Sequence, residues 1–330
     1  MATDWSAARV LVTGATGIVG SWLCRELLGR GARVVALVRD QDPQSELFRS
    51  GDVRRTTVVS GPLEDYATVE RAMNEHEVDV VFHLGAQTIV GTAQRSPIQT
   101  FKSNIEGSWN VLEAARRMGD AVRAVVVASS DKAYGDQPDL PYHEDMPLLA
   151  CHPYDVSKSC TDMLARTYAE SYDLPTVIAR CGNIYGGGDL NWSRIVPGTI
   201  RSILRGERPI VRSDGKYVRD YLYVRDAVSA YMGLADAVRD DERVRGEAFN
   251  FSTESWVTVL EIVEAICKQM KSGLEPEILD RVKGEIRSQS LSAERARREL
   301  GWSAAWDLER GLDETIAWYR DYLGTAGQPC

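Results

Sequence analysis

The sequence predicts an α/β fold, with a doubly wound parallel sheet followed by a smaller C-terminal lobe. Up to residue 183, short apolar runs alternate with segments whose apolar residues recur at helical spacing. Strands that are apolar throughout are typical of a parallel sheet that helices cover on both faces. The alternation stops after residue 185, where the Gly-rich, polar stretch "GGGDLNWSR" begins.

The elements can be assigned in chain order. The sheet strands are expected at 9–14, 33–40, 78–86, 122–130 and 174–183, and the helices between them at 18–31, 101–119 and 152–173. Beyond residue 185, we expect a helix at 195–207, a strand pair within 208–226, a helix near 258–272 and a solvated helix face at 293–300. We therefore assign a first domain to 1–185, with elements near 220–255 returning to it, and a lobe to 186–330.

The composition excludes several classes of protein. The 330 residues are 44% hydrophobic and 26% charged, without an apolar run long enough to span a bilayer and without a secretory signal. The net charge of −9 argues against nucleic acid as a partner, but not against an anionic small ligand. The six cysteines show no paired spacing and the four histidines no HxxxH cluster. These features predict a cytoplasmic protein with reduced thiols and no metal site.

The segment "TGATGIVG" suggests a dinucleotide site. It places Gly14, Gly17 and Gly20 between a predicted strand and a predicted helix. Glycines allow a tight turn and a close approach to a diphosphate, whose charge lies at the helix N-terminus. A simple glycine turn is the alternative, but the strand–loop–helix context favours a Rossmann-type site.

The end of the second strand leaves the kind of dinucleotide open. An acidic side chain there would bind the adenosine ribose of NAD, and Asp40 would serve. Arg39 would instead hold the extra phosphate of NADP. A solvated pair at a strand end is a third interpretation of the same two residues.

A second motif, "YDVSK", places Tyr154 and Lys158 on one face of a predicted helix. An ammonium near a tyrosine hydroxyl favours the phenolate, so we expect Lys158 to lower the pKa of Tyr154 toward the range of a general base. Ser130, at the end of a strand, would complete a proton network.

Over essentially its full length, the chain resembles the extended short-chain dehydrogenases/reductases of the nucleotide-sugar epimerase and dehydratase group. The resemblance includes the two motifs above and the segments "HLGAQ", "NIEGSWNVLEAA", "RCGNIYGGGD", "RDYLYVRDAV" and "LSAERARRELGW".

The resemblance implies specific binding residues. Those expected at the cofactor are Gly14, Thr16, Gly17, Ile18, Val19, Gly20, Arg39, Asp40, Leu63, Leu84, Ala86, Asn104, Tyr154 and Lys158. Those expected at the sugar nucleotide are Gln87, Ser130, Asn183, Arg194 and Arg219. Asp220, which follows Arg219, suggests a fixed arginine fork for phosphate, and a surface ion pair is the alternative.

The residues Ser130-Asp131-Lys132 stand where the resemblance places Thr-Asp-Glu of 4,6-dehydratases. In such enzymes a tyrosine takes the proton of a sugar hydroxyl as hydride leaves C4. An acid and a base then remove water across C5 and C6. Asp131 is our candidate acid. Lys132 is our candidate base and is similar to the lysine of CDP-glucose 4,6-dehydratases. A strand-end salt bridge between the two is the alternative.

We therefore predict an NAD-dependent 4,6-dehydratase of a nucleotide sugar, with CDP-glucose favoured and NADP as the alternative cofactor. The alternatives are a 4-epimerase of a UDP- or CDP-sugar and a non-catalytic NAD(P)-binding regulator. The set of Ser130, Tyr154 and Lys158 argues against the regulator, because a binder needs no proton network. The helices near 101–118 and 153–171 resemble those of a dimer interface, so we expect a homodimer.

Overall fold

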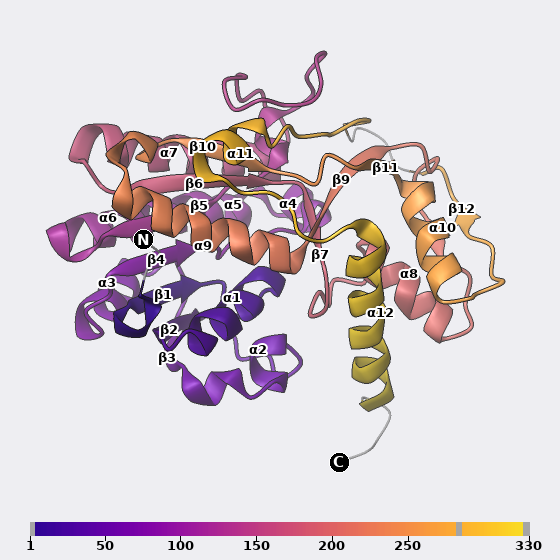
Figure 1. The fold of residues 1–330 in the computed structure, drawn as a ribbon, viewed down its shortest axis with the longest axis horizontal. Helices are drawn as coiled ribbons and strands as arrows, with labels where there is room; N and C mark the ends of the chain where they lie inside the picture. The colour runs from indigo at the N-terminus through magenta and orange to yellow at the C-terminus, as the bar shows by residue number, and fades with distance from the viewer. Residues whose placement is uncertain (1–3, 282–285, 326–330) are drawn as a thin grey trace.

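The computed structural model describes residues 4–281 and 286–325. Its central sheet has seven strands in the order β10-β6-β5-β4-β1-β2-β3, and all neighbouring strands run parallel (Figure 1). The strands are β1 (Arg9–Thr13), β2 (Arg33–Val38), β3 (Thr57–Ser60), β4 (Val80–His83), β5 (Ala124–Ala128), β6 (Thr176–Cys181) and β10 (Ala248–Phe251). The predicted α/β fold with a parallel sheet is confirmed.

Helices pack on both faces of this sheet. Successive strand residues point to opposite faces, so each face carries its own cluster of buried apolar side chains. Val10 and Val12 belong to one buried cluster and Leu11 to the other. The helices of the first cluster are α1 (Ile18–Gly29), α9 (Val224–Asp240) and α11 (Glu294–Leu300). The helices of the second cluster are α3 (Tyr66–Glu75), α6 (Gly107–Arg117) and α7 (Pro153–Tyr172).

Several elements differ from the sequence prediction. The expected helix at 101–119 is divided into α5 (Pro97–Phe101), a π-helix η3 (Lys102–Glu106) and α6. The elements β3, α3, α9, β10 and α12 were not predicted. The short elements are η1 (Trp5–Ala7), α2 (Glu46–Arg49), η2 (Asp52–Arg55), α4 (Val90–Arg95), η4 (Gly119–Ala121), η5 (Asp131–Tyr134) and η6 (Glu242–Val244).

The C-terminal part contains two small sheets. One has the order β11-β9-β7, formed by β7 (Asn183–Tyr185), β9 (Val218–Tyr223) and β11 (Trp256–Thr258). The other joins β8 (Ile210–Val211) to β12 (Glu277–Ile278). The expected strand pair within 208–226 is therefore wrong, because β8 and β9 pair with other strands. Which residues divide the two domains stays a prediction, although β10 joins the first sheet beside β6.

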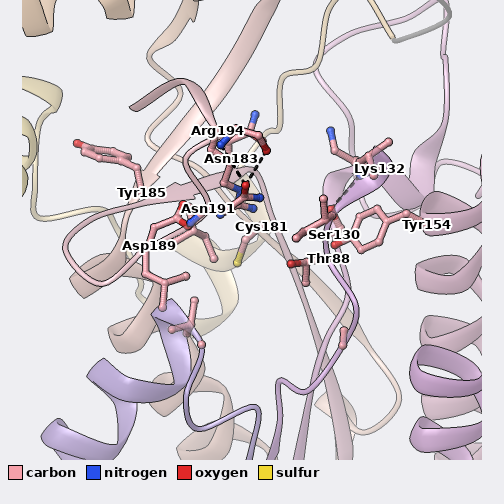
Figure 2. Close-up of a pocket in the computed structure, with 18 of the residues that line it drawn as sticks. Thr88, Ser130, Lys132, Tyr154, Cys181, Asn183, Tyr185, Asp189, Asn191 and Arg194 are labelled. Carbon is pink, nitrogen blue, oxygen red and sulfur yellow. Dashed lines mark hydrogen bonds and ion pairs between the residues drawn. The ribbon is translucent and has the colours of Figure 1, made fainter. Parts of the chain in front are cut away.

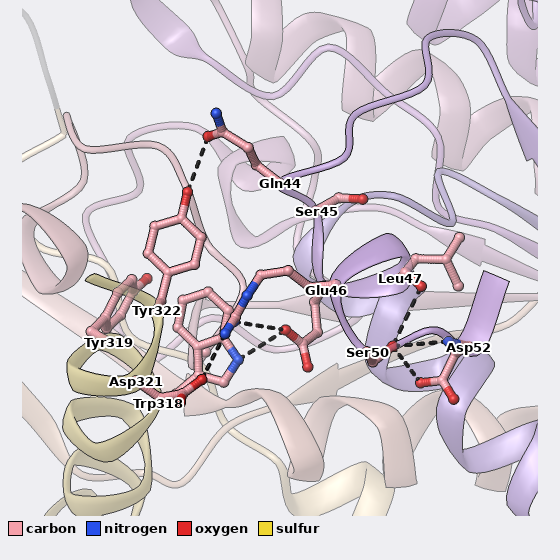
Figure 3. Close-up of polar contacts among 12 residues, drawn as sticks. Gln44, Ser45, Glu46, Leu47, Ser50, Asp52, Trp318, Tyr319, Asp321 and Tyr322 are labelled. Carbon is pink, nitrogen blue, oxygen red and sulfur yellow. Dashed lines mark hydrogen bonds and ion pairs between the residues drawn. The ribbon is translucent and has the colours of Figure 1, made fainter. Parts of the chain in front are cut away.

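Three helices complete this part: α8 (Ile195–Leu204), α10 (Val259–Gln269) and α12 (Leu308–Thr325). They share a buried cluster with β7 and β9. The C-terminal helix α12 also contacts the segment around α2, as Figure 3 shows, where Trp318 donates to Glu46 and Arg49 reaches Asp321. Within residues 4–281 and 286–325, no helix has the length and apolarity to cross a bilayer.

Candidate active site

A glycine turn joins β1 to α1 at the carboxyl edge of the sheet. Gly14 has φ +69°, and a Cβ there would lie 2.8 Å from Gly85. A Cβ on Gly20 would lie 2.2 Å from the carbonyl oxygen of Gly14. Gly17 caps α1 without a side-chain hydrogen bond, so the first N–H groups of the helix need another partner. This cradle fits the diphosphate of a dinucleotide.

The turn opens into a pocket of about 900 Å³. Nearly all the residues predicted to contact the cofactor line it: Gly14, Thr16, Gly17, Ile18, Val19, Gly20, Arg39, Asp40, Leu63, Leu84, Ala86, Tyr154 and Lys158. Of the residues predicted to bind the sugar nucleotide, Ser130, Asn183, Arg194 and Arg219 line it. Both predicted sets therefore open on the same cavity.

Asn104 and Gln87 do not line the pocket but support its wall. The π-helix η3 places the buried Asn104 so that its side chain accepts from Gln87 N (2.7 Å) and donates to Gln87 O (3.0 Å). It also donates to Ser157 Oγ (2.9 Å). The Gln87 side chain folds back onto Ile89, so both residues shape the backbone beside Thr88 and Ile89, which line the pocket.

Arg39 and Asp40 lie at the end of β2 and pair with each other. Arg39 Nε donates to Asp40 Oδ2 (2.6 Å), and both side chains are largely exposed. Both side chains open on the pocket. Their contact with the cofactor stays a prediction.

The tyrosine and lysine of "YDVSK" lie in the first turns of α7 and are both buried. Lys158 Nζ donates to Ala128 O (2.7 Å), and burial lowers the pKa of Lys158 to about 8. The expectation that Lys158 lowers the pKa of Tyr154 is wrong in this structure. Burial raises the pKa of Tyr154, and the largest opposing effect is the charge of Arg194.

The end of β5 explains how adjacent polar residues reach one cavity. The strand ends at Ala128, and Ser130 is the N-cap of the short helix η5, with its Oγ accepting from Lys132 N (3.2 Å). Asp131 and Lys132 therefore both line the pocket. Ser130 Oγ donates to Asp131 Oδ1 (2.9 Å), and Lys132 Nζ donates to Gln289 Oε1 (3.0 Å). Across the described ranges no ion pair joins Asp131 to Lys132, so the strand-end salt bridge is absent there.

Figure 2 shows Ser130, Lys132 and Tyr154 on one side of the pocket and Asn183 and Arg194 on the other. Arg194 Nη1 donates to Asp189 Oδ2 (3.1 Å), so Asp189 fixes the guanidinium.

Arg219 is oriented differently from the expected fork. Its Nη1 donates to Val218 O (2.8 Å) and to Arg287 O (3.2 Å). Asp220 points away from the pocket and accepts from Ser252 Oγ and Leu291 N. Consecutive strand residues face opposite sides, so Asp220 is not the partner that the sequence suggests.

Two further arginines line the pocket that the sequence analysis missed. The Arg201 guanidinium lies 4.8 Å from the Trp192 ring centroid, and Arg212 Nη1 donates to Ser193 O (3.2 Å). Arg201 follows Arg194 by two helical turns, and this spacing could have revealed it. Within the described part of the chain no cluster of His, Cys, Asp and Glu could hold a metal ion.

Residues 10–251 match the model of the NAD dependent epimerase/dehydratase family. The chain belongs to this family. The family's name agrees with the glycine cradle and with the paired tyrosine and lysine at the pocket.

Two relatives of known activity are similar over nearly the whole chain. A CDP-glucose 4,6-dehydratase of Salmonella typhimurium is 27% identical over 337 residues, covering 97% of this chain and 92% of the relative. A dTDP-glucose 4,6-dehydratase of Xanthomonas campestris pv. campestris is 31% identical over 332 residues, covering 94% and 92%.

Solved structures of nucleotide-sugar enzymes have a similar fold. A UDP-glucose 4-epimerase of Thermotoga maritima with UDP-glucose has a TM-score of 0.86 at 28% identity, covering 96% of this chain and 99% of that chain. A dTDP-glucose 4,6-dehydratase of Bacillus anthracis in complex with NAD has a TM-score of 0.83 at 27% identity, covering 96% and 97%.

Proposed function

We propose that this protein is a nucleotide-sugar 4,6-dehydratase that binds NAD and forms a 4-keto-6-deoxy sugar nucleotide, with CDP-glucose as the favoured substrate. One observation supports the proposal most strongly. Asp131 and Lys132 line the pocket beside Ser130 and Tyr154, because η5 follows β5. The resemblance to CDP- and dTDP-glucose 4,6-dehydratases supports it independently.

The glycine turn and the N-terminus of α1 would hold the NAD diphosphate, with Asp40 near the adenosine ribose. Bound NAD supplies the reversible hydride transfer. The chain's own residues handle protons. Tyr154 takes the proton of the C4 hydroxyl, and the charge of Arg194 opposes the rise that burial causes in the pKa of Tyr154. Ser130 supports that hydroxyl from the end of β5. Lys158 would bind the nicotinamide ribose, and its hydrogen bond to Ala128 O fixes its ammonium group at the end of β5.

Asp131 and Lys132 carry the elimination. The C4 ketone acidifies the C5 proton, which Lys132 takes. The C6–O bond breaks as Asp131 gives a proton to the leaving hydroxyl, which departs as water, and a C5–C6 double bond forms. C6 then takes back the hydride that left C4, and C5 takes back the proton from Lys132, which gives the 4-keto-6-deoxy sugar. Asp131 fits this role because Ser130 occupies Oδ1, whereas Oδ2 has no hydrogen-bond partner among the described residues.

The sugar-nucleotide diphosphate would lie opposite, against Arg194 and Arg219. Asp189 holds Arg194, and two backbone carbonyls hold Arg219, so both guanidinium groups are oriented before the ligand arrives. Gln87 would act on the substrate through the backbone of its loop rather than by contact.

The second candidate function is a 4-epimerase of a UDP- or CDP-sugar. The similarity to the UDP-glucose 4-epimerase of Thermotoga maritima supports it. An epimerase turns the keto sugar over and needs no acid and base at C5 and C6. The Asp131–Lys132 pair therefore favours the dehydratase.

We also propose that the protein is a homodimer. Large apolar side chains are exposed on neighbouring helices: Ile98 on α5, Trp109 on α6, and Met163 and Tyr172 on α7. A cytoplasmic location remains a prediction from the unpaired cysteines. The similarity to the dTDP-glucose 4,6-dehydratase of Bacillus anthracis, solved in complex with NAD, supports NAD over NADP.

The product mass tests the function. NAD-loaded enzyme is offered CDP-, dTDP- and UDP-glucose separately, and each sugar nucleotide is followed by mass spectrometry. We expect one substrate, CDP-glucose first, to lose the mass of one water. Asp131→Asn should slow the loss by about 10²–10⁴-fold. Tyr154→Phe should abolish it while NAD binding, measured by calorimetry, is retained. An unchanged mass with a new stereoisomer would establish the epimerase instead.

A further inference from the structure

Gln289 lies far from the motifs of the pocket in the sequence, yet it lines the same cavity as Lys132. It is almost fully buried, with 1% of its surface exposed. Lys132 Nζ donates to its Oε1 (3.0 Å), which joins residues 157 positions apart.

The backbone around Gln289 is fixed on both sides. Gln289 N donates to Val218 O (3.1 Å) on β9, and Val218 N donates to Arg287 O (3.0 Å). On the other side Tyr142 N donates to Ser290 O (2.8 Å). A buried side chain on an anchored segment holds its partner in one place.

The side chain of Gln289 is uncharged, which affects how readily the amine of Lys132 loses a proton. A carboxylate in its place would stabilise the protonated amine of a lysine by charge as well as by hydrogen bonding. An amide oxygen accepts the hydrogen bond without adding charge. Other charged and titratable groups line the same pocket. They are Arg39, Asp40, Asp42, Glu64, Asp131, His152, Tyr154, Asp155, Lys158, Cys181, Tyr185, Asp189, Arg194, Arg201, Arg212, Tyr217, Arg219, Tyr221 and Tyr231.

The other half of the amide points to a missing partner. Gln289 Nε2 is buried without a hydrogen-bond partner among the residues that the structure describes, as is Asp131 Oδ2. Buried donors are rarely left unpaired once a protein has bound its ligand. A bound sugar offers hydroxyl oxygens that would satisfy this donor.

We propose that Gln289 is a positioning residue for Lys132, holding its amine at the sugar through an uncharged acceptor that leaves the amine able to lose its proton. The inference rests on the proposed dehydratase function, in which Lys132 takes the C5 proton. Gln289 acts through Lys132.

The first test measures the titration of Lys132 directly. NAD-loaded protein is acylated with trace acetic anhydride across a range of pH, and the labelling of Lys132 is read by peptide mass spectrometry. We expect Gln289→Glu to move the labelling midpoint of Lys132 upward by about one pH unit or more. The control Asn74→Asp adds the same charge on the exposed surface of α3 and should leave the midpoint unchanged. An unmoved midpoint in Gln289→Glu would overturn the proposal.

The second test measures the pH profile of water loss. The acid limb of kcat for Gln289→Glu should shift upward with the labelling midpoint, so that activity recovers at high pH. Gln289→Met, which keeps the volume but lacks the acceptor, should lower kcat by about tenfold or more without that recovery. A shifted midpoint with an unchanged profile would also overturn the proposal. If the wild-type enzyme removes water from no sugar nucleotide, the proposed function itself has failed, whatever the labelling shows.

Discussion

At the scale of single residues, burial determines the protonation of His83 at the end of β4. Its Nδ1 lies 2.9 Å from Thr13 Oγ1 and its Nε2 lies 2.9 Å from Ser108 Oγ. Burial lowers the pKa of His83 to about 3, and the charge of Lys158 acts in the same direction. The neutral ring therefore links β1, β4 and α6 directly beneath the glycine turn.

This neutral histidine predicts a loss of stability in mild acid. An unfolded histidine titrates near pH 6.5, so below that pH the unfolded chain binds a proton that the folded chain does not. The stabilisation is complete above about pH 6.5. As the pH falls below it, the free energy of unfolding should drop by up to about 1.4 kcal/mol per pH unit from this group alone.

Denaturant unfolding of wild type and His83→Asn between about pH 5 and pH 7 isolates this effect. The variant should be less stable at pH 7 and should have a shallower dependence on pH. The control His76→Asn changes a partly exposed histidine at the end of α3 and should keep the wild-type slope. Equal slopes for His83→Asn and wild type would contradict the assignment.

Sequence patterns could predict the site residues that lie at the end of one strand or at the start of one helix. Ser130, Asp131 and Tyr154 follow from the apolar run before them or from helical spacing, and all line the pocket. Gln289 and Arg212 could not be predicted, because neither lies in a motif. The segment after residue 286, which pairs with β9, places Gln289 at the pocket, and the end of β8 places Arg212 there. The sequence also could not predict that the pKa of Tyr154 is raised, since residue spacing does not reveal how deeply a side chain is buried.

At the scale of elements, α12 holds the segment that carries Arg194. A Cβ on Gly187 would lie 2.3 Å from the Trp318 ring, so the ring packs directly against the glycine. Tyr319 OH donates to Asp189 O, and Asp189 in turn orients Arg194. The helix α12 also contacts α2 (Figure 3). It therefore joins the side of the pocket that carries Arg194 to the segment that follows Asp40.

The hydrogen bond from Trp318 Nε1 to Glu46 Oε2 (2.9 Å) tests this link. Trp318→Phe keeps an aromatic ring against Gly187 but removes the donor to a buried carboxylate, which should cost about 1–2 kcal/mol. We expect the Tm to fall on the order of 2–4 °C in differential scanning fluorimetry. The control Ile278→Val trims an exposed side chain on β12 and should leave the Tm in place. A Tm unchanged in both variants would show that the bond contributes nothing.

At the scale of the whole molecule, local pattern predicted the first sheet better than the lobe. Each strand of the parallel sheet except β3 and β10 was expected, because a strand buried on both faces is apolar throughout. The lobe depends on pairings such as β8 with β12, between residues 67 positions apart, Ile210 with Glu277. Such short strands have no periodicity of their own, and their partners follow only from tertiary packing.

The face formed by α6 and α7 leads to the last prediction. Tyr168 OH donates to Glu113 (3.3 Å) and Arg116 lies over the Tyr172 ring, so the two helices present one continuous surface. Trp109 and Met163 are exposed on these helices, at 44% and 62%. A second copy packed there would remove this apolar area from water, at about 25 cal/mol per Å².

Light scattering at micromolar concentration should therefore give the mass of a dimer for the wild type. The double variant Trp109→Glu/Met163→Glu should give the mass of a monomer, because two buried carboxylates on each subunit would oppose association. Ile278→Glu places the same charge on an exposed apolar position of β12 and should stay dimeric. Since α7 also carries Tyr154 and Lys158, a dimer would stabilise the helix that holds both side chains at the pocket. The monomeric variant should then lose activity at a lower temperature than the control. A wild type that is monomeric throughout would remove both expectations.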